Sequence, residues 1–72
     1  MNLGEYISNR GAQARLAEAL AISPVLVHQW AFGKRPIPIH RCVQIEIVTG
    51  GQVTRRELRP QDWQIIWPEL NS

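Results

Sequence analysis

Three residues in the middle of the chain have side chains suited to contacting the edges of DNA base pairs. Val25, His28 and Gln29 point outward from a helix expected to begin at Pro24, because successive helical residues advance by about 100°. A glutamine amide can pair with N6 and N7 of adenine, and an exposed valine can contact the methyl group of thymine. We predict that these three side chains contact bases. His28 could instead contact a phosphate or make no contact with DNA. Gln29 and Val25 could instead be ordinary exposed residues.

A second group of polar residues flanks this helix where DNA phosphates would lie. Lys34 and Arg35 follow the helix directly, and long cations there would otherwise have no partner. Gln13 lies at the start of the preceding helix, where its amide and the helix N-terminus could hold a phosphate. Ser23, the expected N-cap of the second helix, completes the predicted set of phosphate contacts.

Residues that could support catalysis or bind a metal do not form a recognisable motif. His28, His40 and Cys42 lack the paired spacings of a zinc site, and no serine stands in a glycine-rich elbow. Gly50 and Gly51 do not form a phosphate-binding loop. A chain of 72 residues also encloses little concave volume around a substrate. We expect no enzyme activity, no cofactor and no small-molecule substrate, and we assign Cys42 to the core.

The elements that must position the DNA-contacting residues are two short helices joined by a tight turn. The residues expected on their core-facing sides are Leu16, Ala17, Leu20, Val27 and Trp30. Ser23 and Pro24 start the second helix, because serine caps a helix and proline needs no hydrogen bond in the first turn. A small residue at Ala17 lets the helices approach closely. The sequence therefore predicts a helix-turn-helix over residues 13–31.

A first helix and a basic loop are expected on either side of this pair. Asn2 and Glu5 form a capping-box pattern, and the helix that they start should end near Arg10-Gly11 and cover the helix pair. After the pair, residues 34–38 form an extended basic loop, because prolines restrict themselves and the residues before them. Helical geometry points Phe32 outward with Val25, His28 and Gln29, but its role is ambiguous and it could tuck under this loop.

The last third of the chain is expected to close the core. Residues 39–49 repeat apolar side chains at helical spacing and end at two glycines. In the C-terminal tail, residues 54–72, Thr54 and Glu57 form a second capping box. The tail then places apolar residues at i, i+3, i+4 and i+7, namely Trp63, Ile66, Trp67 and Leu70. We favour a short helix packed on the core; a strand around residues 64–67 that pairs with a second subunit is the alternative.

Composition and charge limit the class of protein. The chain is 44% hydrophobic, is long enough for one small domain over residues 1–72, and has one cysteine and no apolar run near membrane-spanning length. The net charge is +2, but residues 10–41 hold five cations and one acidic residue, which gives this stretch +4. This asymmetry favours a polyanionic partner, and we expect a cytoplasmic protein on the bacterial nucleoid. The tail arginines could add a second basic patch or pair with Glu57 and Asp62.

The sequence resembles the phage Cro/CI-type, lambda-repressor-like helix-turn-helix proteins. The stretch SPxxVxQWxxGKRPxP, followed by RCVxIExxTGG and RPxDWxxIWPEL, is similar to the YdaS-like branch and covers nearly the whole chain. The resemblance implies an all-α protein of about four to five short helices that binds DNA and regulates transcription. Ala21 occupies the turn position where such proteins often have glycine, and Leu26 and His28 replace small polar residues.

We therefore expect a Cro-type repressor of phage or prophage origin that binds a pseudo-palindromic operator in double-stranded DNA. One small module makes few base contacts. Two copies that form a homodimer, at least on DNA, would combine the contacts of both. One alternative is a YdaS-like antitoxin with a toxin partner. The other is a protein-interaction module that keeps the fold and has lost DNA binding.

Overall fold

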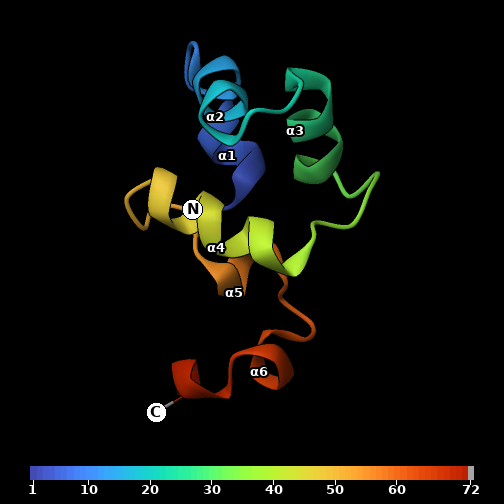
Figure 1. Cartoon of the computed structure of the whole chain (residues 1–72), viewed down its shortest axis with the longest axis vertical. Coiled ribbons are helices and arrows are strands. Elements are labelled where there is room, and N and C mark those ends of the chain that lie inside the picture. Colours follow the sequence, from blue (N-terminus) through green and yellow to red (C-terminus); the bar gives the residue numbers. More distant parts are fainter. Residues whose placement is uncertain (72) are drawn as a thin grey trace.

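The computed structural model describes residues 1–71, which form six short α-helices and a 3-10 helix (Figure 1). In chain order these are α1 (Leu3–Ile7), α2 (Ala12–Leu20), α3 (Pro24–Ala31), α4 (Ile39–Val48), α5 (Arg55–Leu58), α6 (Trp63–Ile66) and the 3-10 helix η1 (Pro68–Asn71). No strand occurs in residues 1–71, so the predicted all-α class is confirmed, with one or two more short helices than expected.

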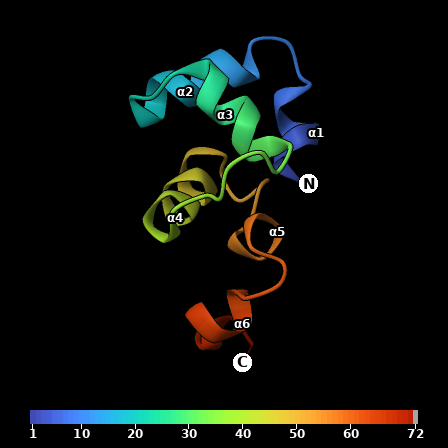
Figure 2. The ribbon, with the colours of Figure 1, turned by 90° about the vertical axis from the view of Figure 1, so that its right-hand side faces the viewer.

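The helices follow one another along the long axis of a molecule that measures 35 × 23 × 20 Å. Figures 1 and 2 show α1, α2 and α3 together at one end, with α4 next to them, then α5, and α6 at the opposite end. The helix-turn-helix pair and the C-terminal helix therefore lie at opposite ends of the molecule.

The side chains predicted to join α2 to α3 are buried between them. Leu16, Ala17 and Val27 are at most 1% exposed, and Trp30 is 7% exposed. Cys42 from α4 is completely buried in the same core, as predicted, and burial raises the pKa of its thiol. The predicted core faces of both helices are confirmed.

The turn between α2 and α3 holds Ala21 in the left-handed region, with φ 58° and ψ 43°. The N–H of Ile22 donates to the carbonyl oxygen of Ala17 at 3.0 Å, which closes the end of α2. The hydroxyl oxygen of Ser23 accepts from the N–H of Leu26 at 3.2 Å, and Pro24 is the first residue of α3. The predicted cap is thus confirmed, and Ala21 takes the conformation that glycine adopts more easily.

The first helix ends earlier than predicted, at Ile7 rather than near Arg10-Gly11. The side chain of Ser8 donates to the carbonyl oxygen of Glu5 at 2.6 Å, and that of Asn9 donates to Tyr6 at 3.0 Å. These short polar side chains satisfy carbonyls that a continuing helix would have used, which stops the helix. The predicted capping box of Asn2 and Glu5 is present at its start.

The C-terminal tail is helical and its apolar face turns toward the core, as we favoured. Trp67 is 7% exposed and belongs to the core, whereas Ile65, on the other side of α6, is 82% exposed. The helix does not continue past Ile66, because Pro68 cannot donate a backbone hydrogen bond and begins η1. Partly buried side chains that pack beside Trp67 include Trp63, Ile66 and Leu70.

The tail arginines have partners within the chain. Arg59 forms an ion pair with Asp62 at 2.8 Å, as one of our alternatives proposed, but Arg55 pairs with Glu46 of α4 at 3.0 Å rather than with Glu57. The guanidinium of Arg55 lies 5.4 Å from the ring centroid of Trp67. These groups hold the tail, so they do not form a free basic patch.

Candidate nucleic-acid interface

The outer face of α3, which we define as Val25, His28, Gln29 and Phe32, points to solvent. Val25 is 65% exposed and His28 is exposed, while Gln29 is half-buried. Val27 and Trp30, on the opposite side of the helix, are buried. The three predicted base-contacting residues therefore share one accessible face of α3, although Gln29 presents less of its side chain than the other two.

The basic loop folds back on the end of α3. The carbonyl oxygen of Gln29 accepts hydrogen bonds from the backbone N–H of Lys34 at 2.8 Å and of Arg35 at 3.4 Å. Gly33, with φ 71°, makes this reversal possible, since that conformation is unfavourable for other residues. The side chains of Lys34 and Arg35 are exposed beside the last turn of α3. Two cations are thus held next to the outer face.

Gln13 has a structural role that the sequence did not reveal. Its side-chain amide is half-buried and donates to the carbonyl oxygen of Pro24 at 2.8 Å, so it links α2 to the start of α3. Ser23 is exposed and uses its hydroxyl oxygen as the cap of α3. The phosphate contacts assigned to both residues stay predictions. In Gln13, one amide hydrogen is used in the bond to Pro24, so a phosphate contact would use the other.

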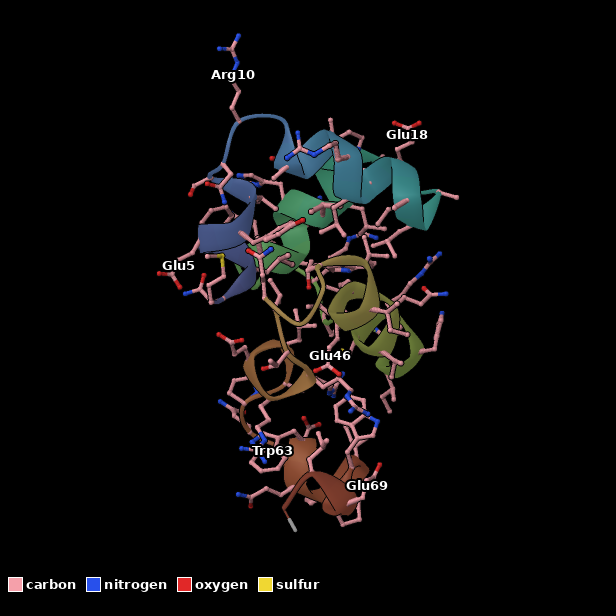
Figure 3. All side chains as sticks on the ribbon, turned by 90° about the vertical axis from the view of Figure 1, so that its left-hand side faces the viewer. Glu5, Arg10, Glu18, Glu46, Trp63 and Glu69 are labelled. Carbon is pink, nitrogen blue, oxygen red and sulfur yellow. The ribbon has the colours of Figure 1, made fainter. Side chains whose placement is uncertain are left out.

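The five cations of residues 10–41 do not all serve the same surface. Arg41 donates to the carbonyl oxygen of Leu20 at 2.9 Å and to the side chain of Gln44 at 3.1 Å, so it caps the C-terminal end of α2. Figure 3 shows Arg10 pointing away from the ribbon at the end of the molecule that carries α2. The excess charge is therefore divided between a helix cap and exposed side chains.

Phe32 is a member of the outer face whose role the sequence left ambiguous. Its side chain is 57% exposed and does not tuck under the basic loop, and its ring centroid lies 4.6 Å from that of His28. The outward direction expected from the i, i+3 and i+7 spacing of Val25, His28 and Phe32 is confirmed.

The residues that the structure describes form neither a metal site nor a membrane-spanning helix. No group of three or more His, Cys, Asp or Glu side chains in residues 1–71 is arranged to hold a metal ion. Within the same residues, every helix is too short or too polar to span a bilayer.

The buried pair α2 and α3, the tight turn and the exposed face of α3 define a small helix-turn-helix protein. Residues 3–66 match the model of the family described as "Bacterial toxin YdaS", and the chain belongs to this family. The YdaS-like resemblance seen in the sequence is therefore confirmed.

A curated relative from Escherichia coli (strain K12) carries a different kind of description. The chain is 44% identical over 57 residues to "Putative transcriptional regulator YdaS". The aligned residues make up 78% of this chain and 58% of the relative. This chain thus aligns with less than two thirds of the length of that relative. The family description thus names a toxin, whereas the name of this relative describes a regulator of transcription.

Proposed function

We propose that this protein binds double-stranded DNA in the major groove through α3 and regulates transcription, as a sequence-specific repressor of Cro type. The observation that carries the proposal is the juxtaposition of the outer face of α3 with the exposed cations of the basic loop, Lys34 and Arg35. Base edges require hydrogen-bonding and small apolar groups on an accessible helix, and phosphates require cations beside it. The name of the relative supports a role in transcription.

Each predicted contact has a defined part in this proposal. Gln29 pairs with adenine, Val25 contacts a thymine methyl group and His28 contacts a neighbouring base. Lys34 and Arg35 contact phosphates beyond the end of α3, and Gln13 and Ser23 contact phosphates near its start. These roles require α3 to enter the groove with its outer face toward the bases.

One copy offers few base contacts, so we propose that two copies bind a pseudo-palindromic operator. Half-sites about one helical turn apart would let a homodimer, formed in solution or on DNA, add the contacts of both copies. The proposed place of action is the bacterial nucleoid, in the cytoplasm, within a phage or prophage regulatory circuit.

Selection of bound sequences from a random pool of DNA duplexes tests the proposal. A DNA-binding regulator enriches one motif, and the repeat of that motif gives the half-site spacing. The affinity for the enriched duplex should fall steeply as salt rises, because phosphate contacts release counterions. Failure to enrich any motif, together with negligible affinity for DNA at low salt, would contradict the proposal.

Two other functions make different predictions for the same measurements. A protein-interaction module that has lost DNA binding enriches no sequence and has no salt-dependent affinity for DNA. An antitoxin requires a toxin partner encoded elsewhere, and the family description names a toxin. The exposed helix face, with the cations Lys34 and Arg35 beside it, offers the groups that base edges and phosphates require, so DNA binding is the function that we put forward.

A further inference from the structure

Phe32 leaves a large apolar ring in water at the end of α3. The basic loop could have covered it, but the loop instead sends Ile37 into the core, where this side chain is 7% exposed, and leaves Phe32 57% exposed. Exposed aromatic side chains lose favourable burial, so a ring kept uncovered on a functional face has the properties expected of a contact residue.

The ring is held in place from two sides. The imidazole of His28, one turn earlier in α3, lies 4.6 Å away between centroids at an interplanar angle of 47°. On the other side is α1, where a Cβ placed on Gly4 would lie 3.7 Å from Cε1 of Phe32 and 3.9 Å from the carbonyl oxygen of Ala31. These are ordinary van der Waals separations, so the part of α1 around Gly4 lies directly beside the ring. A ring positioned in this way has less rotational freedom to lose on binding.

The outer face of α3 is therefore apolar at both ends and polar in between. Val25 lies at its start, Phe32 at its end, and His28 and Gln29 lie between them. Base edges in the major groove offer mostly hydrogen-bonding groups, and the prominent apolar group is the 5-methyl of thymine, which phenylalanine can contact.

We propose that Phe32 is a specificity-determining residue that contacts the 5-methyl group of a thymine and that its ring keeps His28 oriented toward the neighbouring base. This proposal rests on the proposed function and adds a second methyl-reading position to the one assigned to Val25. A preferred half-site then contains two thymines whose methyl groups matter, one read from each end of α3.

Replacement of thymine by deoxyuridine tests this role, because the two bases differ only in the 5-methyl group. Each thymine of the duplex enriched from the random pool is replaced in turn, and affinity is measured for the parent, Phe32→Ala and Phe32→Leu. In the parent, one replacement per half-site should lower affinity about fourfold through Phe32, as expected for one buried methyl group. In Phe32→Ala that loss should disappear at this position only, whereas Phe32→Leu should retain part of it.

Controls separate the base contact from other effects. Ile65→Ala removes an even more exposed apolar side chain from α6, at the other end of the molecule. It should leave unchanged the deoxyuridine profile, which is the set of affinity losses caused by replacing each thymine in turn. Because Phe32 is more than half exposed, its alanine variant should melt close to the parent. Replacement of the thymine assigned to Val25 by deoxyuridine should still lower the affinity of Phe32→Ala.

An identical deoxyuridine profile in the parent and in Phe32→Ala overturns the proposal. A change in oligomeric state on DNA without a change in that profile also overturns it and assigns Phe32 to a protein contact. If the parent enriches no duplex, the proposed function itself fails and the role of Phe32 fails with it. That outcome is seen with the parent alone, before any variant is made, so the two failures are distinguishable.

Discussion

The side-chain amide of Gln13 donates a hydrogen bond to the carbonyl oxygen of Pro24 at 2.8 Å and so joins the first turn of α2 to the first turn of α3. Both helices also meet through buried apolar contacts, but this bond links their N-terminal ends on the solvent side. The position of α3, and hence of the outer face, depends in part on a polar side chain of the neighbouring helix.

Loss of this link should destabilise the protein without DNA present. Gln13→Ala should lower the free energy of unfolding by about 1 kcal/mol, the usual worth of one such hydrogen bond. The control is Gln64→Ala, which removes an exposed glutamine of α6 and should stay within about 0.5 kcal/mol of the parent. Thermal melts that place both variants at the same stability would show that the bond contributes nothing in solution.

Ala21 makes the turn conformation costly, because its φ of 58° brings Cβ close to the backbone. Ala21→Gly should therefore stabilise the fold by up to about 1 kcal/mol, despite the larger entropy of glycine in the unfolded chain. Ala19→Gly is the matched control, because Ala19 is exposed in the last turn of α2 and its replacement should cost up to about 1 kcal/mol. Denaturant unfolding in which both variants lose stability would contradict strain at Ala21.

The ion pair of Arg59 and Asp62 should make stability depend on pH. Hydrogen bonds from Arg59 lower the pKa of Asp62, so the unfolded chain binds this proton first as the pH falls. The stabilising contribution is complete above the ordinary aspartate pKa of about 3.9 and disappears as the pH falls through the lower folded value. The difference in melting temperature between the parent and Asp62→Asn should therefore shrink on acidification.

Glu18→Gln is the control for that measurement. Glu18 is exposed on α2, and its carboxylate forms no hydrogen bond or ion pair with residues 1–71. Its variant should follow the parent at every pH. A constant difference in melting temperature between the parent and Asp62→Asn across the acid range would show that the pair does not stabilise the fold.

Arg59 also donates to the carbonyl oxygen of Ile37 at 2.7 Å, so weakening the pair should loosen the end of the basic loop.

The burial of Trp67 within its own chain should make the melting temperature independent of protein concentration. Trp67→Ala should cost about 3–5 kcal/mol, which approaches the whole stability of a small domain. Trp67→Phe is therefore the more informative variant and should lower the melting temperature equally at low and high concentration, while Ile65→Ala should have little effect. A melting temperature of the parent that rises with concentration, and no longer does so in the Trp67 variant, would assign the tail to a subunit interface.

Local signals made much of this fold predictable from the sequence. Capping residues such as Asn2 and Ser23, and glycines such as Gly33, act on their own helix ends, so they can be read without knowing the rest of the structure. The apolar spacing of the tail also identified its buried face. The division of its last part into α6 and η1 was missed, although Pro68 marked the place.

Contacts between distant segments were not predictable in the same way. Nothing near Arg41 indicates that it caps the end of α2, 21 residues earlier in the chain, and nothing near Gln13 indicates Pro24 as its partner. Helical geometry directs Phe32 outward, but whether the basic loop covers it depends on which residue of that loop enters the core. Such contacts arise only when the helices are packed.

Gln29→Ala and Lys34→Ala, compared on preferred and scrambled duplexes over a range of salt, test the central claim most directly. Gln29→Ala should lose about 1–3 kcal/mol on the preferred duplex and relax the preference at one base pair, with little effect on scrambled DNA. Lys34→Ala should weaken binding to both duplexes alike and reduce the salt dependence by about one phosphate contact. The same ratio of affinities for preferred and scrambled DNA in the parent and in Gln29→Ala would contradict base recognition by α3.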